Sequence, residues 1–233
     1  MTNYPINKTM NHNDLRSDKA QEIIRDLNTL IKELESKELK ISSWYGSLAD
    51  KIDDEFEQIN RGYGYTEEVN SYCDNKFPWF LYWEIIWVVL NNNFNKGDRV
   101  LDLGGSSSLF SYYLASKGMN VVTVDIDKSL VENANKVGKK MDWSLKNILM
   151  DMRDLKINDK FDHITSICVF EHIIMFERVK INKTIKELLK TGGRFSITFD
   201  YRNPSGFAKI SSPKDIKEQF IDPSGLSLRG NSD

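Results

Sequence analysis

The sequence predicts an α/β fold, a mostly parallel sheet with helices on both faces, preceded by a helical N-terminal extension. After Lys96, short apolar runs alternate with stretches of helical periodicity, which is typical of βαβ units and a parallel sheet. Before that point, apolar residues recur at three- and four-residue spacing, which is typical of amphipathic helices. A chain of 233 residues is long enough to bury one hydrophobic core of this kind.

The N-terminal extension is expected to span residues 1–76 and to contain two amphipathic helices. The first lies between Ser17 and Lys40, and its apolar stripe is Ala20, Ile24, Leu27, Ile31 and Leu34. The second ends before Gly62, and its stripe is Leu48, Ile52, Phe56 and Ile59. We expect these helices to pack over the sheet or over each other. The alternative is a homodimer seam, or a seam with a partner protein, built like a short coiled coil.

An apolar run from Phe77 to Leu90 is predicted to form a buried helix. Pro78 suits the first turn of this helix, because its missing N–H would have no intrahelical partner there. The run contains Glu84 and is shorter than the roughly 20 residues that cross a bilayer, so we expect no membrane association. Most of the aromatic rings between Tyr63 and Trp87 are expected in the core.

The second domain is expected to span residues 77–233. Its first five strands are predicted at Arg99–Leu103, Asn120–Val124, Trp143–Met150, His163–Val169 and Gly193–Phe199. Helices are predicted between them at Ser108–Lys117, Lys128–Lys139 and Phe176–Lys190, with Gly118 closing the first and Gly192 the third. A further helix is expected from Ser212, and a sixth strand from Gly225. No seventh strand remains before Asp233.

Composition favours a cytoplasmic location and disfavours nucleic acid as a partner. The net charge is −2, so no global positive field attracts nucleic acid or an anionic membrane. The two cysteines, Cys73 and Cys168, lack metal-ligand spacing and are too few for a disulfide framework; no metal is expected. Residues 1–14 are polar and contain no signal-peptide core.

The sharpest local motif is Val100–Ser108, in which an apolar strand breaks into a turn of small residues and then a helix. Gly104 and Gly105 permit the backbone dihedrals and the close approach that a ligand on a strand end requires. The N–H groups at the helix start are suited to a carboxylate or a phosphate. The structural alternative is that any tight β-to-α turn favours Gly and Ser.

A second motif ends the next strand, about 20 residues further along the chain. In nucleotide-binding α/β folds, a carboxylate at the position of Asp125 accepts hydrogen bonds from ribose hydroxyls. Asp127 is well placed to cap the helix that begins at Lys128. We therefore assign ribose binding to Asp125 and capping to Asp127.

In their order, these motifs resemble the class I S-adenosylmethionine-dependent methyltransferases, particularly the branch that modifies small molecules. The resemblance extends from about Phe77 to Gly225. It includes Phe161–Ile173, which is similar to the family's fourth-strand segment with its Glu-His end, and Lys190–Phe195, which is similar to the turn into strand five. The resemblance implies a Rossmann-like fold and S-adenosylmethionine as the cofactor.

The resemblance also implies which residues hold the cofactor. The acid of strand one and the glycine turn hold the methionine moiety, and the acid after strand three contacts the adenine amino group. The expected cofactor-binding residues are Asp102, Gly104, Gly105, Ser106, Asp125, Ile126, Asp151, Met152 and Val169. Where the family usually has further glycines, this chain has Ser106 and Ser108, which either crowd the cofactor or add a hydrogen bond. The same departure argues against a nicotinamide dehydrogenase.

Glu171 and His172 are the candidate catalytic residues. They follow strand four and face the region of the acceptor, and a histidine titrates in a useful range for taking a proton. The alternative is that Glu171 caps the following helix and His172 only orients it. Tyr63, Tyr65 or Trp79 are candidates for contacting the sulfonium or the acceptor, since aromatic faces attract cations. Asp200 and Tyr201 are further pocket candidates at the end of strand five.

The segment after strand four also bears on the acceptor. Methyltransferases of DNA and RNA bases carry an Asn/Asp-Pro-Pro-aromatic motif or a nucleophilic Pro-Cys there, and Cys168–Glu171 is neither. The sequence therefore predicts O- or N-methylation of a metabolite, sugar or lipid precursor. The alternative is a non-catalytic methyltransferase-like subunit that binds a partner protein, favoured by the serine-rich turn, the helical front and the missing seventh strand.

Overall fold

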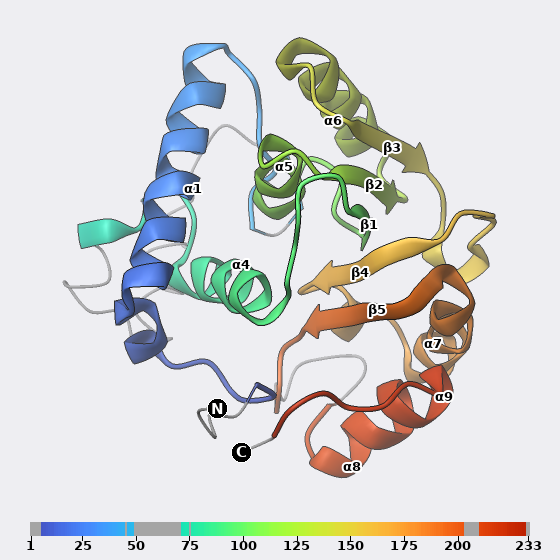
Figure 1. The fold of residues 1–233 in the computed structure, drawn as a ribbon. Helices are drawn as coiled ribbons and strands as arrows, with labels where there is room; N and C mark the ends of the chain where they lie inside the picture. The colour runs from blue at the N-terminus through green and yellow to red at the C-terminus, as the bar shows by residue number, and fades with distance from the viewer. Residues whose placement is uncertain (1–5, 45, 49–70, 75, 203–209, 232–233) are drawn as a thin grey trace.

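The structure, a computed structural model, describes residues 6–44, 46–48, 71–74, 76–202 and 210–231. A five-stranded, all-parallel sheet separates two layers of helices (Figure 1). The strands are β1 Arg99–Leu103, β2 Asn120–Asp125, β3 Leu145–Leu149, β4 Phe161–Ile167 and β5 Leu189–Thr198. Their spatial order is β3-β2-β1-β4-β5. The predicted Rossmann-like α/β class is confirmed.

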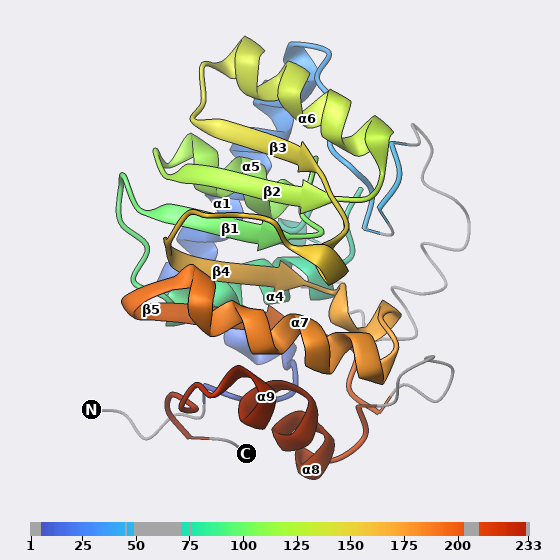
Figure 2. The ribbon, with the colours of Figure 1, turned by 90° about the vertical axis from the view of Figure 1, so that its right-hand side faces the viewer.

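The strand order reverses next to β1, and this reversal positions the site. From β1 the chain moves outward to β2 and β3, and then returns to place β4 on the other side of β1. The crossovers on the two sides of β1 therefore diverge, which opens a crevice at the carboxyl ends of the strands. Figure 2 shows all five arrows pointing toward this same edge.

The helices include short 3-10 and π segments. They are η1 His12–Arg16, α1 Asp18–Ser36, α4 Trp79–Asn91, α5 Leu109–Ser116, α6 Lys128–Met141, η2 Met152–Asp154, η3 Phe170–His172, α7 Met175–Leu188, α8 Pro213–Ile216, η4 Lys217–Ile221 and α9 Asp222–Ser224. The described helix α1 and the helices from α4 to α7 lie where the sequence predicts them, within a few residues. The second predicted N-terminal helix lies outside the described residues.

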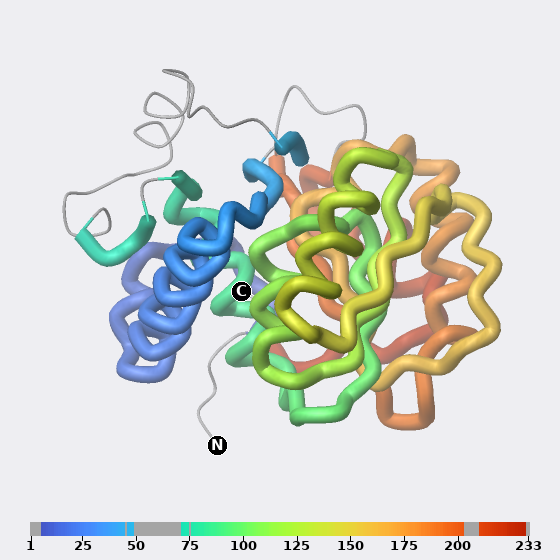
Figure 3. The backbone as a smooth tube through the Cα atoms, turned by 90° about the horizontal axis from the view of Figure 1, so that it is seen from above, coloured from blue at the N-terminus to red at the C-terminus, as the bar shows by residue number. Residues whose placement is uncertain are grey.

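Two hydrophobic clusters lie on opposite faces of the sheet. One contains side chains of α1, α4, α5 and α6 together with Val100 and Val121. The other contains Leu101, Leu103 and Val124, together with side chains of α7. Neighbouring residues of β1 thus point to opposite faces, as the pleat of a strand requires. Figure 3 shows the blue helix α1 on one side of the molecule and the orange and red segments that include α7 on the other.

Helix α1 forms an outer layer over α4 and α5. The stripe Ala20, Ile24, Leu27, Ile31 and Leu34 is at most 1% exposed and belongs to the same cluster as α4 and α5. The hydroxyl of Ser17 caps the helix by accepting from the N–H of Ala20 at 3.3 Å. This stripe therefore packs against other helices of the same chain, as one of the two interpretations predicts. It is buried and does not offer a surface for a coiled-coil interface with another chain.

Two expectations for the C-terminal half are wrong. Gly192 does not close the third helix, because α7 ends at Leu188 and Leu189 at once pairs with Phe161 of β4; Gly192 lies within β5. Gly225–Leu228 forms no strand. Gly225 instead adopts a φ of 60° and ends α9, and the chain then runs toward the amino end, where Ile6 and Asn7 donate to the carbonyl of Asn231.

None of the described helices has the length and apolar character that crossing a bilayer requires.

Candidate active site

A groove of about 2400 Å³ runs along the carboxyl ends of the strands. Pockets for one small molecule are usually about 300–1,000 Å³, so this groove has room for two ligands side by side. Its lining includes twelve residues that the sequence predicts as cofactor, acceptor or catalytic candidates: Asp102, Gly104, Gly105, Asp125, Ile126, Asp151, Met152, Val169, Glu171, His172, Asp200 and Tyr201. The carboxylates of Asp102, Asp125 and Asp151 thus lie at the ends of three adjacent strands and line one groove.

The turn after β1 requires both of its glycines. Gly104 has a φ of 78°, and a Cβ there would lie 2.8 Å from a methyl group of Val169. A Cβ on Gly105 would lie 1.8 Å from Oδ2 of Asp102. No side chain fits at either position, and the backbone of the turn is therefore open to close approach by a ligand.

Asp102 lies beneath this turn and is 1% exposed. Its carboxylate accepts hydrogen bonds from Ser111 Oγ at 2.6 Å and from Thr165 Oγ1 at 2.8 Å. Burial raises the pKa of Asp102 to about 6, although both hydrogen bonds oppose this shift. Asp102 therefore supports the turn from below in addition to lining the groove.

The serines of the turn point into the protein or cap a helix. Ser106 Oγ lies 2.6 Å from Thr123 Oγ1, which in turn donates to Asn147 at 2.7 Å. Ser107 takes a φ of 64°, the left-handed conformation usually given to glycine, and donates to the carbonyl of Leu130 at 2.7 Å. Ser108 caps α5. Since Ser106 does not line the groove, its side chain does not crowd a ligand there.

The end of β2 carries the second acid. Asp125 is 8% exposed and accepts from the N–H of Asp127 at 3.0 Å. Burial raises the pKa of Asp125. The adjacent Ile126 is 70% exposed and lines the groove, so it offers an apolar surface to a flat ring. Asp127 accepts from the N–H groups of Ser129 and Leu130, which confirms its assignment as the cap of α6.

Asp151 and Met152 follow β3 and form the outer wall of the groove. The Asp151 carboxylate accepts from the N–H of Arg153 at 2.8 Å and from Arg153 Nε at 2.9 Å. These contacts lower the pKa of Asp151, chiefly through the guanidinium of Arg153. Asp151 is therefore a charged acceptor held in a fixed orientation.

Glu171 and His172 form a single 3-10 turn, η3, between β4 and α7. Glu171 is 7% exposed, and His172 is exposed at the groove. The interpretation of Glu171 as a helix cap is wrong, because Ile174 is the N-cap of α7 and that cap has no side-chain hydrogen bond. Burial raises the pKa of Glu171.

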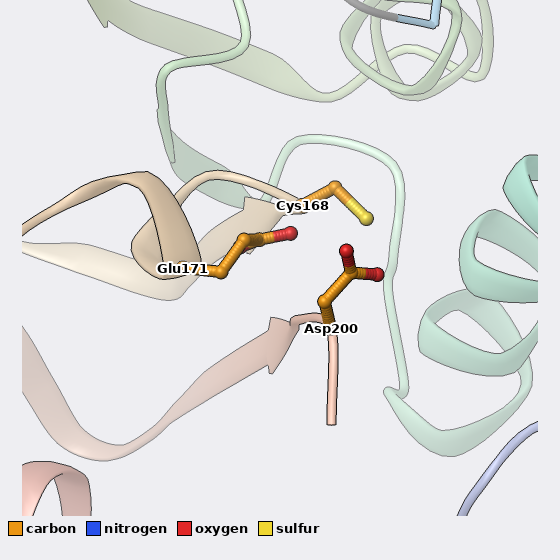
Figure 4. Close-up of side chains that lie close together, drawn as sticks. All are labelled: Cys168, Glu171 and Asp200. Atoms are coloured by element: carbon orange, nitrogen blue, oxygen red, sulfur yellow. The ribbon is translucent and has the colours of Figure 1, made fainter. Parts of the chain in front are cut away.

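The ends of β4 and β5 bring three ligand-type atoms together. One atom each of Cys168, Glu171 and Asp200 lies within 4.8 Å of the others, and Figure 4 shows the three side chains converging on one point. Glu84 of α4 joins them, because Cys168 Sγ donates to its Oε1 at 2.8 Å. Glu84 is a groove residue that the sequence did not predict, although a lone carboxylate in an otherwise apolar helix is a signal that could have indicated it.

Two of the described site residues that the sequence predicts do not line the groove. Trp79 is 3% exposed and stacks edge-on against His12, with ring centroids 6.4 Å apart, in the core around α4. Ser106 is turned inward, as described above. Tyr63 lies outside the described residues, and so does Tyr65.

Part of the chain is similar to known methyltransferases. Residues 101–197 match the family model described as a methyltransferase domain. A ubiquinone biosynthesis O-methyltransferase of Xanthomonas oryzae pv. oryzae is 29% identical over 114 residues, which cover 48% of this chain and 47% of that protein. Its counterpart in Coxiella burnetii is 31% identical over 109 residues, covering 46% of each. The chain thus spans about half the length of the curated relatives it matches.

Solved structures show similar coverage. An S-adenosylmethionine-dependent methyltransferase from Clostridium acetobutylicum is 26% identical with a TM-score of 0.45, covering 50% of this chain and 48% of that one. The protein TehB from Haemophilus influenzae is 25% identical with a TM-score of 0.48, covering 53% and 45%.

Proposed function

We propose that this chain is a class I S-adenosylmethionine-dependent methyltransferase that transfers a methyl group from S-adenosylmethionine to a small molecule, since residues 101–197 match a methyltransferase domain model. The observation that carries the proposal is the groove, in which Asp102, Asp125 and Asp151 end three neighbouring strands around a turn that has no space for side chains.

The lining of the groove fits the cofactor. Asp125, Ile126, Asp151 and Met152 all line the groove. Asp125 would accept from the ribose hydroxyls, Ile126 and Met152 would lie against the adenine, and Asp151 would accept from its amino group. The backbone at Gly104 and Gly105 would hold the methionine moiety, because a Cβ at either glycine would meet Val169 or Asp102. Val169 separates this half of the groove from the ends of β4 and β5, where the acceptor would lie.

When bound, S-adenosylmethionine supplies an electrophilic methyl carbon, which forms a bond to the acceptor nucleophile as its bond to sulfur breaks. The chain's own contribution is mainly positioning, since such a displacement needs the two reactants aligned at near-attack distance. His172 is exposed to the groove and takes the proton that a hydroxyl or ammonium acceptor loses. Glu171 and Tyr201 line the same end.

A small acceptor is supported by three features. The net charge of −2 provides no field for nucleic acid. The segment after β4 lacks the motifs of base methyltransferases, and the curated relatives are named for O-methylation in ubiquinone biosynthesis.

We further propose a cytoplasmic location, consistent with the two free cysteines. The alternative of a non-catalytic subunit was favoured in part by the serine-rich turn. Because Ser106 is turned away from the groove, its side chain does not obstruct a cofactor there, and this argument for the alternative is removed.

Titration calorimetry with S-adenosylmethionine and S-adenosylhomocysteine tests this proposal. We expect both to bind with one site per chain, and we expect Asp125→Ala to weaken binding. Asp154→Ala is the matched control, because Asp154 is an exposed acid that does not line the groove and forms an ion pair with Lys156 at 2.7 Å. Absence of binding of either compound by the folded protein would favour the alternative of a non-catalytic subunit.

A further inference from the structure

The chain turns sharply at Cys168, directly after β4. This residue has a φ of 51°, in the left-handed region that favours glycine. A cysteine in this region is strained, and such strain persists only where the surrounding structure holds the backbone in place. Cys168 also lines the groove, so the strain lies at the candidate active site.

Two neighbouring elements hold Cys168 in this conformation. On the side of β5, the carbonyl oxygen and the hydroxyl oxygen of Thr198 accept from the backbone N–H of Cys168 at 3.2 and 3.1 Å. On the side of α4, Oε1 of Glu84 accepts from the thiol at 2.8 Å. A glycine would adopt the same backbone conformation without strain, but it could not form the contact with α4. The hydrogen bond to Glu84 is therefore what a side chain at this position adds.

The thiol of Cys168 is a neutral hydrogen-bond donor. Figure 4 shows the carboxyl groups of Glu171 and Asp200 beside it. Burial, together with Glu84 and Glu171, holds the pKa of Cys168 well above its ordinary value, so it is an S–H and not a thiolate nucleophile. Glu84 accepts in either protonation state, because a protonated carboxyl group keeps an acceptor oxygen. The contact therefore does not require a charge on Glu84.

The next residue, Val169, connects this turn to both halves of the groove. Its methyl carbons lie 2.8 and 2.9 Å from the point that a Cβ of Gly104 would occupy. Val169 thus packs on the glycine turn that would hold the methionine moiety. Its carbonyl oxygen accepts from the N–H of His172 at 3.0 Å. The backbone conformation of Cys168 therefore fixes where Val169 and His172 lie.

Building on the proposed function, we propose that Glu84 and Cys168 are positioning residues for methyl transfer. Through the hydrogen bond between them, α4 holds the left-handed turn after β4, and this turn keeps Val169 packed on the glycine turn. Neither residue reacts with a ligand. When the hydrogen bond is lost, the strained turn relaxes, and Val169 moves from the place beside which the sulfur of the cofactor would lie. Cofactor affinity thus depends on a carboxyl group of α4.

Calorimetry with S-adenosylhomocysteine and urea titrations of the same variants test this inference. Glu84→Leu removes the acceptor oxygens and places an apolar side chain in an apolar helix. Because a buried carboxyl group is costly, we expect this variant to be at least as stable as the parent protein. We nevertheless expect it to bind S-adenosylhomocysteine at least about fivefold more weakly, which is the scale of one lost hydrogen bond. Glu84→Gln keeps an acceptor oxygen and is expected to restore most of the affinity.

Cys168→Ala removes the donor of the same hydrogen bond and is expected to weaken S-adenosylhomocysteine binding by a similar factor. Cys73→Ala is the matched control, because Cys73 is the other cysteine of the chain and does not line the groove. Its affinity is expected to equal that of the parent protein. When Glu84→Leu and Cys168→Ala are combined, the second substitution is expected to cost little further affinity, because both remove one contact.

The outcomes separate this inference from the proposed function. If the parent protein and both single variants bind S-adenosylhomocysteine equally well, the positioning role is wrong and the proposed function stands. If the parent protein does not bind it, the proposed function fails, and the inference that rests on it fails too. A loss of affinity in Glu84→Leu that accompanies a loss of stability would indicate a structural role only. Equal losses in Glu84→Gln and Glu84→Leu, or additive losses in the double variant, would also overturn the inference.

Discussion

Replacing Gly105 with alanine is the sharpest perturbation of the glycine turn. Gly105 is outside the left-handed region of the backbone, so its requirement is one of space and not of conformation. The added methyl group would lie 1.8 Å from Asp102 Oδ2 and 2.4 Å from its carboxyl carbon. Either the carboxylate or the turn has to move.

Each way of relieving this contact has a calculable cost. Moving the carboxylate breaks its hydrogen bonds from Ser111 and Thr165, and hydrogen bonds to charged groups are worth about 1.5–3 kcal/mol each. Moving the turn is overpacking, which costs about 1–3 kcal/mol. We expect the turn to move, because this is the cheaper route. The free energy of unfolding then falls by about 1–3 kcal/mol, and affinity for S-adenosylhomocysteine falls because the turn shifts.

Urea titrations of three variants measure this effect. Gly97→Ala is the control, because Gly97 has a φ of 90° with nothing within 4 Å of an added Cβ, and its cost is only the left-handed backbone, about 1 kcal/mol. In an Asp102→Ala background the obstacle is gone, and Gly105→Ala is expected to cost less than about 1 kcal/mol. Equal costs of Gly105→Ala in the two backgrounds, or a cost no larger than that of Gly97→Ala, would refute the reasoning.

Three further predictions follow from the groove. Asp125→Ala should weaken S-adenosylhomocysteine binding by more than about 1 kcal/mol in calorimetry, since hydrogen bonds to a charged acceptor are lost; unchanged affinity would remove Asp125 from the site. His172→Ala should slow methyl transfer at constant cofactor affinity, and equal turnover would exclude it as the base. Burial raises the pKa of Glu84 from 4.5 to about 8, so the folded state holds a proton that the unfolded state has released. The free energy of unfolding therefore falls as the pH rises between these two pKa values. Glu84→Gln removes the titrating group, so we expect the decrease of unfolding free energy with pH to be smaller by up to about 1.4 kcal/mol per pH unit. Urea titrations at about pH 5 and about pH 8 would show it, and an unchanged slope would contradict it.

The sheet was predictable because each strand is an apolar run bounded by clear signals. The predicted bounds of β1 agree with the structure, since Val100 to Leu103 is uninterrupted and Gly104 ends it. A glycine followed by alternating apolar residues is typical both of a strand start and of a helix end. Gly225 ends α9, and the sequence pattern did not indicate where this short helix lies. The sixth strand was therefore a reasonable but wrong prediction.

The cofactor half of the groove was more predictable than the acceptor half. Asp102, Asp125 and Asp151 each follow a strand directly, so their common edge follows from the sheet alone. Glu84 contacts Cys168, which lies 84 positions further along the chain. Because the helix around Glu84 is apolar on all sides, no local pattern indicates which of its side chains point toward the groove. Trp79 shows the converse, since its aromatic neighbourhood suggested a binding surface and the structure packs it beside His12.

A crystal structure with S-adenosylhomocysteine bound tests the central claim most directly. The account predicts the ribose hydroxyls at hydrogen-bond distance from the carboxylate of Asp125, the adenine between Ile126 and Met152, and the sulfur beside Val169. A ligand bound elsewhere, or a groove that stays closed to it at saturating concentration, would contradict the assignment of this strand edge as the cofactor site.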